Sequence, residues 1–335
     1  MHILAILSVL FLNGSVSPAD SLPYVHYKDN ITVYSITGFN ATNVSIKPKY
    51  LDFGRERYFL NPPLLLGFGV SYKGIDLGIT RRMGAHLVSE NKFGKSDYFD
   101  FKFRFPIKRI YFAFRAQHYR EFSLLNHDYP EEVAPNKHLV LPDFSTLSIN
   151  LDARYFLKKD FSYRAAMGFS GHYNEDFFTP YVYSYFGVSA VARDSMTLLP
   201  TYAVNEIADV SKSNSVGCFE FGAIPGVAYV KRYEKWQGAL LLGWGPLVQI
   251  KWYETQDQSR PFFGLSSRTD LQMSFGYHQE RWFLQVMSEF QFRRINFPQM
   301  SVQQYYYDLR IFFGYLIKVK KHPKIVLRLE EKGVL

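Results

Sequence analysis

The feature that most constrains this chain is a strict two-residue alternation of apolar and polar side chains over long segments. From Leu147 to Tyr155, Leu, Ile, Leu, Ala and Tyr alternate with Ser, Asn, Asp and Arg. Segments 99–105 and 309–319 repeat the pattern, with rows of Phe, Leu and Ile opposite rows that carry charges. Alternate side chains of a strand point to opposite faces, so each segment has one apolar face and one charged face. The pattern predicts an all-β chain.

The length of these segments distinguishes between a membrane-spanning barrel and a soluble β-protein. Strands of soluble proteins usually have about 5–6 residues, whereas a membrane-spanning strand needs about 9–11. Several segments here reach that length, and aromatic residues, 18% of the chain, lie near many segment ends, as Trp244 and Trp252 do. Aromatic rings form girdles at both headgroup levels of membrane barrels. We therefore predict an antiparallel transmembrane β-barrel rather than a soluble sandwich or a lipocalin-like barrel.

The alternation predicts about 12 strands, with 10 to 14 compatible with the pattern, and bacterial barrels have an even number. Two shorter extended stretches, 31–37 and 43–47, would add a hairpin. Short turns usually face the periplasm and long loops the outside, but the predicted strands do not keep this order throughout, which indicates that one strand is missed or split. We expect strands near 64–73, 75–82, 97–105, 108–119, 145–156, 161–172, 178–192, 215–230, 238–253, 267–278, 281–295 and 304–319.

The first residues have the pattern of a signal peptide. An apolar run from Ile3 to Leu12 precedes small residues, and Ser17-Pro18-Ala19 offers a cleavage site. The run is too short to cross a bilayer, which takes roughly 20 residues; the alternative is a buried N-terminal strand. We predict a signal peptide at 1–19, an N-terminal extended segment at 20–62, the barrel at 63–320 and a C-terminal tail at 321–335. An exported barrel of this kind belongs in the outer membrane of a Gram-negative cell.

The net charge indicates which partners the chain could bind, and the cysteine count indicates whether it could form a disulfide. The net charge is +9, and the densest basic group lies at 318–324. A basic rim facing anionic lipids, including lipopolysaccharide, fits an exported barrel better than nucleic acid does, so we expect lipid contacts, no nucleic acid, and small solutes only if the lumen is open. Cys218 is the single cysteine, so it cannot form an internal disulfide, and its strand context predicts buried packing rather than a reactive thiol.

The charged faces form the candidate site. Arg or Lys facing lipid at the bilayer midplane costs about 2–4 kcal/mol, so these faces should line the lumen. Mixed signs allow two interpretations, a salt-bridged structural plug or the selectivity ring of a pore for small solutes, and the balance of signs favours the plug. We expect Arg104 and Arg115 to face Asp100 and Asp152. The predicted lumen charges are Asp76, Asp100, Lys102, Arg104, Arg115, Asp152, Arg154, Arg164, Glu220, Glu289, Arg293, Asp308 and Arg310.

Catalytic chemistry has weaker support. His118 and His172 end predicted strands, and His127 precedes Asp128 in a long loop, but no Ser–His–Asp spacing stands out. His127, Asp128, Glu131, Glu132 and His138 match no metal-ligand template. We assign no catalytic residue, no metal and no cofactor, and keep an outer-membrane hydrolase with a His/Asp site at the rim as the alternative to a scaffold or pore.

The passage Lys159 to Ala166, KDFSYRAA, is the most distinctive of several motifs that extend from about residue 30 to 319. Together these motifs resemble a domain-of-unknown-function family, number 4421, of outer-membrane barrel proteins in Bacteroides-like bacteria. Two departures are Pro62, where the family has Asn, and Tyr181–Ser184 in place of a glycine-rich insert. The resemblance implies a barrel and an outer-membrane location but no activity. The remaining similar passages are 61–73 with the following 76–77, 95–100 with 117–119, and 222–229.

Overall fold

The computed structural model describes residues 22–27, 30–50, 54–72, 75–107, 109–125, 138–169, 171–194, 196–205, 208–255 and 258–319. The signal peptide and the C-terminal tail predicted from the sequence lie outside these residues. Short elements are β1 (Tyr24–His26), β3 (Glu56–Phe59), β9 (Gly171–Tyr173), α2 (Glu90–Phe93), α3 (Tyr163–Ala166), η1 (Thr201–Ala203) and η2 (Asp209–Lys212). Twelve described strands have ten or more residues: β2 (Asn30–Pro48), β4 (Pro63–Tyr72), β5 (Ile75–His86), β6 (Asp97–Ile107), β7 (Ile110–Leu124), β8 (Leu139–Phe156), β10 (Phe177–Arg193), β11 (Ser215–Tyr233), β12 (Trp236–Glu254), β13 (Ser259–His278), β14 (Trp282–Asn296) and β15 (Met300–Lys318).

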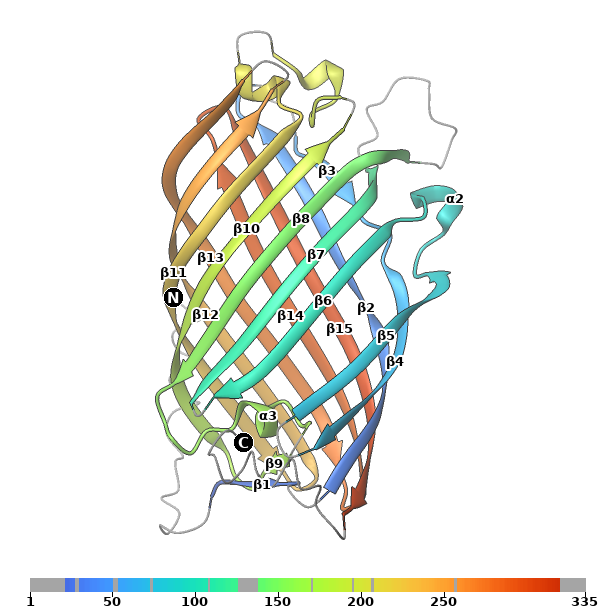
Figure 1. Cartoon of the computed structure of the whole chain (residues 1–335), viewed down its shortest axis with the longest axis vertical. Helices are drawn as coiled ribbons and strands as arrows, with labels where there is room; N and C mark the ends of the chain where they lie inside the picture. Colours follow the sequence, from blue (N-terminus) through green and yellow to red (C-terminus); the bar gives the residue numbers. More distant parts are fainter. Residues whose placement is uncertain are drawn as a thin grey trace.

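The strands form a closed antiparallel barrel (Figure 1). Hydrogen bonds join ten strands into a ring in the order β2, β15, β14, β13, β12, β11, β10, β8, β7 and β3. Pairing of β15 with β2 closes it over the full length of both strands, from Met300 opposite Pro48 to Lys318 opposite Asn30. The short β3 joins β2 to β7 near one end. Outside this ring, β4 and β5 extend from β2, and β6 extends from β7.

Two sequence predictions about strands were wrong. The segment 161–172, predicted as a strand, contains α3, which begins after Ser162 because its hydroxyl accepts a hydrogen bond from the Ala165 amide. The stretches 31–37 and 43–47, predicted as a hairpin, are one strand, β2. Asn40 and Thr42 interrupt its apolar pattern because they face a polar part of the interior, where both are buried. With these corrections, the described connections alternate regularly between the two ends of the barrel.

The outer surface of the barrel is apolar. Large hydrophobic side chains on outward-facing positions are exposed all around the wall, among them Phe68 at 68% and Phe263 at 74%. Soluble monomers rarely expose apolar patches larger than a few hundred Å², whereas lipid-facing barrel strands require them. The predicted fold class is therefore confirmed: the wall spans a membrane, with apolar rows facing lipid.

Among the described residues, no helix has the length and apolar character that a helical membrane crossing requires.

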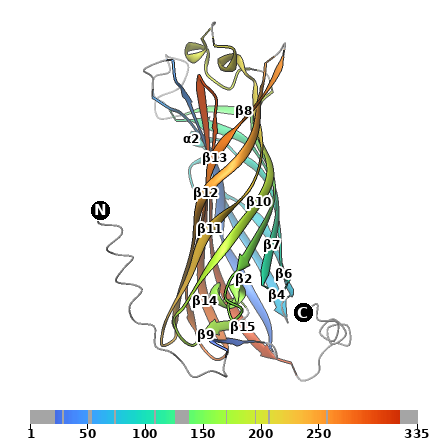
Figure 2. The ribbon, with the colours of Figure 1, turned by 90° about the vertical axis from the view of Figure 1, so that its left-hand side faces the viewer.

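Two apolar layers fill the interior at different heights. We call the end with η1, η2 and α2 the upper end and the end with α3, β9 and β1 the lower end, as in Figure 1; Figure 2 shows β9 at the lower end from the side. The lower apolar layer surrounds α3 and includes Tyr34, Tyr111, Phe156, Tyr163, Met167, Phe169, Tyr181, Leu241, Phe283 and Phe312. The upper apolar layer includes Val44, Ile46, Tyr58, Phe122, Phe144, Val191, Leu198, Leu199, Val216, Cys218, Tyr253, Phe297 and Val302.

Candidate functional site

Between the apolar layers lies a charged section of the lumen, which we call the middle layer. Of the predicted lumen charges, Asp76 lies on β5, but its side chain is outside the described part of the structure. Arg164 is on α3 rather than on the wall, and its Nη2 donates to Ser71 Oγ at 2.7 Å. The other eleven are on strands with their side chains directed into the barrel: Asp100, Lys102, Arg104, Arg115, Asp152, Arg154, Glu220, Glu289, Arg293, Asp308 and Arg310.

Glu289 on β14 is the centre of the largest ion-pair cluster. Its carboxylate accepts hydrogen bonds from Arg115 Nη2 at 2.5 Å and Arg104 Nη2 at 3.0 Å, and it pairs with Lys102. The neighbouring Asp308 lies directly opposite it on β15. A buried charge is tolerated only when it is paired and hydrogen-bonded, and here three cations from β6 and β7 compensate one carboxylate across the lumen.

Arg104 and Arg115 were expected to face Asp100 and Asp152, and both arginines form an ion pair with Glu289. Arg115 Nη2 lies 3.9 Å from Asp152 Oδ2, but its shorter ion pair is with Glu289. Asp100 accepts hydrogen bonds from amides, from Asn40 and from Gln117 Nε2 at 3.2 Å. Arg104 forms its ion pair with Glu289, across the lumen, and not with Asp100 on its own strand.

Arg154 and Asp270 form the most enclosed pair. Arg154 Nε and Nη2 donate to the two oxygens of Asp270 at 2.9 and 2.7 Å, and both residues are almost fully buried. Tyr181 donates a third hydrogen bond to the carboxylate at 3.0 Å. The Tyr183 ring lies 4.7 Å from the guanidinium carbon. A two-pronged arginine–carboxylate pair of this kind fixes geometry as well as charge, so it connects β8 to β13 across the interior.

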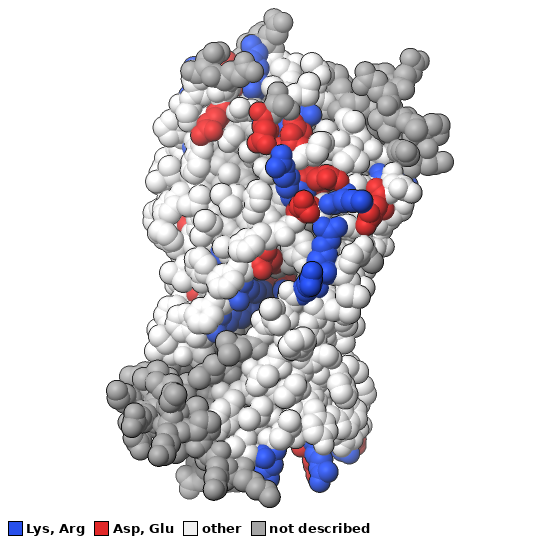
Figure 3. Space-filling view, turned by 45° about the vertical axis from the view of Figure 1, so that its right-hand side comes forward, with Lys and Arg blue, Asp and Glu red and all other residues white. Residues whose placement is uncertain are grey.

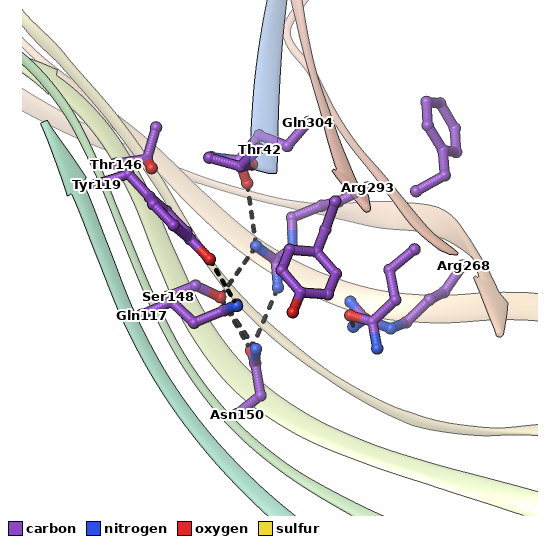
Figure 4. Close-up of a pocket in the computed structure, with 12 residues that line it drawn as sticks. Thr42, Gln117, Tyr119, Thr146, Ser148, Asn150, Arg268, Arg293 and Gln304 are labelled. Atoms are coloured by element: carbon purple, nitrogen blue, oxygen red, sulfur yellow. Dashed lines mark hydrogen bonds between the residues drawn. The ribbon is translucent and has the colours of Figure 1, made fainter. Parts of the chain in front are cut away.

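Glu220 is the centre of a third cluster nearer the upper end. It accepts hydrogen bonds from Arg293 Nε at 2.8 Å and Gln249 Nε2 at 2.9 Å, and Arg268 Nη1 lies 3.5 Å away. Figure 4 shows Arg293 directed toward Ser148, Asn150 and Gln304 beside a cavity. The cavity is about 30 Å³ in volume. That is room for one or two water molecules.

Sequence reasoning missed Arg268 and Asp270. Both are on β13, in the row Arg268, Asp270, Gln272 and Ser274 opposite the apolar row Leu271, Met273 and Phe275. The same two-residue alternation that identified the other lumen charges was therefore present. Their partners were not predictable, because Arg154 and Asp270 are 116 positions apart in the sequence and on strands that are not neighbours.

The segment 161–173, which we call the cork, enters the lower end of the barrel. The buried Gln237 side chain on β12 donates to the Ala165 and Ala166 carbonyls at 2.8 and 3.0 Å and accepts from the Tyr173 amide at 2.7 Å. Tyr163 donates to Gln272 Oε1 at 2.6 Å. The distinctive FSYRAA passage thus forms the cork, and its polar groups are matched to groups on the wall.

We expect a Gly168→Ala substitution to lower the free energy of unfolding by about 2 kcal/mol. Gly168 has φ of +77°, which only glycine adopts without strain, and a methyl group there would overlap Gln285 Oε1. The measurement is urea-induced unfolding in lipid vesicles. The control is Gly84→Ala on β5, where an added methyl group meets no atom within 4 Å. Equal effects at the two positions would contradict a docked cork.

The histidines considered for catalysis are not brought together. His118 is on the outer face of β7, whereas His172 is on β9 in the cork, where its Nδ1 lies 2.9 Å from the Tyr27 hydroxyl. Burial, with a smaller contribution from Arg232, lowers the pKa of His172 to about 4, so the ring is neutral at physiological pH. His138 is half-buried against Phe93. His127, Asp128, Glu131 and Glu132 lie outside the described residues, and the described ones form no group of three or more metal-ligating side chains.

A second cavity, of about 310 Å³, opens on the outer surface near the upper end. Its walls come from β2, β3 and β15, and they place two exposed cations, Arg55 and Arg57, beside Tyr305 and Tyr307. Arg55 Nη1 donates to Gln303 Oε1 at 2.7 Å. Basic and aromatic side chains together are typical of the headgroup level of a membrane.

Comparisons with known proteins match one family model and several solved structures. No curated protein matches the chain. Among solved structures, the outer membrane protease OmpT from Escherichia coli is similar at 8% identity and a TM-score of 0.38, over 90% of this chain and 100% of that one. An outer membrane channel from Pseudomonas putida F1 is similar at 8% identity and a TM-score of 0.27, over 90% and 100% of the two chains. The family described as Domain of unknown function (DUF4421) matches residues 18–316, which include the cork and the charged lumen, and the chain belongs to that family.

Proposed function

We propose that this protein is a non-conducting outer-membrane barrel that acts as a scaffold. The observation that carries the proposal is the filling of the lumen at three successive levels. The upper apolar layer, the charged middle layer and the lower apolar layer around the cork each contain buried side chains from strands around the wall. A solute pore needs a continuous water-lined path, and three packed levels oppose one.

The orientation follows from the lengths of the connections. At the lower end, β4–β5, β6–β7, β11–β12 and β13–β14 are joined by two or three residues, and the connection 157–176, which contains the cork, is the exception. At the upper end β14–β15 is equally short, but the connections 125–138 and 194–214 are long. Barrels of this class place short turns in the periplasm and longer loops outside. The upper end therefore faces the exterior, and the scaffold presents its long connections there. Arg55 and Arg57 then lie at the outer headgroup level, where phosphates of lipopolysaccharide are the matching partners.

The middle layer supports a structural role rather than selection of ions. Its cations and carboxylates are intermixed and pair across the lumen, as Arg154 and Asp270 do. A selectivity ring presents one dominant sign to a passing solute, whereas this arrangement neutralises itself. Paired charges fix which strand positions face each other, since a shift by one residue would turn them all toward lipid.

Planar-bilayer recording tests the proposal. We expect the full chain to produce no channel openings at any applied voltage, in the same lipid in which a general porin gives steady conductance. Gel migration before and after boiling serves as the control for folding, because folded barrels of this class migrate differently from unfolded ones. Reproducible openings from heat-modifiable protein would overturn the scaffold and restore the pore for small solutes.

A further inference from the structure

The outer wall changes its strand pairing beside the second cavity. Residues 32–38 of β2 pair with β4 and residues 44–46 pair with β3, and among the described residues neither strand pairs with 39–43. On its other side β2 stays paired with β15, with Asn43 opposite Tyr305. The cavity of about 310 Å³ borders this stretch, and we call it the notch. Its volume lies at the lower end of the range for small-molecule sites, about 300–1,000 Å³.

The polar side of the notch is cationic. Arg55 and Arg57 line it and are exposed, and none of the described residues around it is acidic. Gln303 Oε1 accepts hydrogen bonds at 2.7 Å from both Arg55 Nη1 and the Tyr305 hydroxyl. Ser45 also lines the notch, and its buried hydroxyl has no hydrogen-bond partner among the described residues. Two guanidinium groups beside a hydroxyl suit an anion with several oxygens, such as a phosphate.

Another side of the notch is aromatic. Tyr305 and Tyr307 project outward from β15, and their ring centroids lie 5.2 and 5.3 Å from those of Phe292 and Phe290 on β14. Phe59 on β3 contributes a further ring. One face of a sugar ring consists of C–H groups, which pack flat on an aromatic ring, while the sugar hydroxyls bond to polar groups around it. Arginines beside these rings therefore match a phosphorylated sugar better than a bare phosphate.

The notch lies at the upper edge of the lipid-facing wall. Below Tyr307, β15 directs Leu309, Ile311 and Phe313 outward, and the last two are exposed. Figure 3 shows a similar division on one face of the barrel, where charged side chains gather over the upper part and an uncharged belt lies below them. Tyrosine and arginine side chains are typical of the headgroup level. A lipid with its head in the notch would extend its acyl chains along this apolar row, which a soluble ligand would leave unused.

We propose that the notch binds the phosphorylated sugar headgroup of an outer-leaflet glycolipid, the chemical class to which lipopolysaccharide belongs. The phosphate accepts hydrogen bonds from Arg55 and Arg57, the sugar ring packs on Tyr307, and the acyl chains lie along β15. The inference deepens the lipid contact proposed for the two arginines and rests on the orientation that places the upper end outside. It does not depend on a closed lumen, so channel openings would leave it untouched.

Native mass spectrometry of the full chain in detergent micelles provides the binding assay, with diphosphorylated lipid A as the probe. We expect one lipid A to bind per chain, and lipid A without its phosphates to bind about 10-fold more weakly or worse, since charge-assisted hydrogen bonds are lost. Because micelles have no inner and outer leaflet, the assay tests the notch independently of the orientation and of conductance. Equal binding of the dephosphorylated lipid would contradict recognition of the phosphate.

Two competitors separate the parts of the ligand. Phosphatidic acid offers a phosphate and acyl chains without a sugar, and glucosamine phosphate offers a phosphorylated sugar without acyl chains. We expect each to displace lipid A only at a concentration about 10-fold higher or more than unlabelled lipid A requires. Displacement by glucosamine phosphate at the concentration of lipid A itself would indicate a soluble ligand and contradict a lipid. Equal displacement by phosphatidic acid would contradict recognition of the sugar.

Substitution of the two arginines locates the site. We expect Arg55→Gln with Arg57→Gln to weaken lipid A binding by about 10-fold or more. Both side chains are exposed, so this variant should fold, and gel migration before and after boiling checks that it does. The matched control is Lys212→Gln with Arg260→Gln, which removes two exposed cations at the upper end that do not line the notch. Equal weakening by the two double variants would indicate general charge attraction and overturn the site.

Discussion

Replacing Asp270 with Asn is expected to lower the free energy of unfolding by about 3–5 kcal/mol, measured by urea titration in lipid vesicles. Asp270 accepts two hydrogen bonds from Arg154 and one from Tyr181, at 2.7–3.0 Å, and neither member of the ion pair has appreciable solvent exposure. An amide in its place leaves a buried guanidinium without a counter-charge. The loss therefore reflects an uncompensated charge more than the value of the pair itself.

Two further variants separate that explanation from a general effect of the substitution. Asp194→Asn removes the same charge from an exposed pair, in which Asp194 and Arg120 are 67% and 54% exposed, and should cost less than about 1 kcal/mol. Arg154→Met combined with Asp270→Leu removes both charges and should recover at least half of the loss, because an apolar pair needs no compensation. A double variant as unstable as Asp270→Asn would show that the charges themselves hold the strands.

The alternation predicted the wall strands because each face of such a strand meets a single environment along its length, lipid on one side and the barrel interior on the other. Along β8, the row from Leu147 to Tyr155 faces lipid, and the row with Asp152 and Arg154 faces the interior, so two-residue periodicity persists from Phe144 to Phe156. Such a pattern fixes the orientation of side chains without any knowledge of which strands are neighbours. The same alternation directs eleven of the predicted charges into the barrel interior.

The same reasoning failed for a segment whose side chains are buried on every side. Ala165, Ala166 and Met167 in the cork are all fully buried, so no alternation distinguishes a helix from a strand there. Pairing across the lumen was also hidden, because Glu289 meets cations from β6 and β7 that are more than 170 positions away. Periodicity reports the environment of one strand, whereas a partner depends on barrel closure and on the height of each residue within it.

Phe144→Ala is expected to lower the free energy of unfolding by about 3–5 kcal/mol, because it removes a ring from the centre of the upper apolar layer. Phe144 is on β8 and fully buried; its ring stacks on Tyr58 with centroids 4.3 Å apart, and the Phe122 centroid lies 5.0 Å away. Tyr58 is held in turn by a hydrogen bond from its hydroxyl to the Leu198 carbonyl. The layer therefore cannot collapse easily around the missing ring, and a cavity should remain.

The size of this effect distinguishes a packed lumen from a wet one. In a water-filled channel the same truncation would expose no new cavity, and the loss would be below about 1 kcal/mol, as for surface positions. Phe144→Leu provides the graded control: it retains most of the volume and should cost about 1–1.5 kcal/mol. A small loss for Phe144→Ala, with Phe144→Leu unchanged, would place water at this level of the barrel. A large and graded loss means that the upper apolar layer is a hydrophobic core enclosed by the barrel wall.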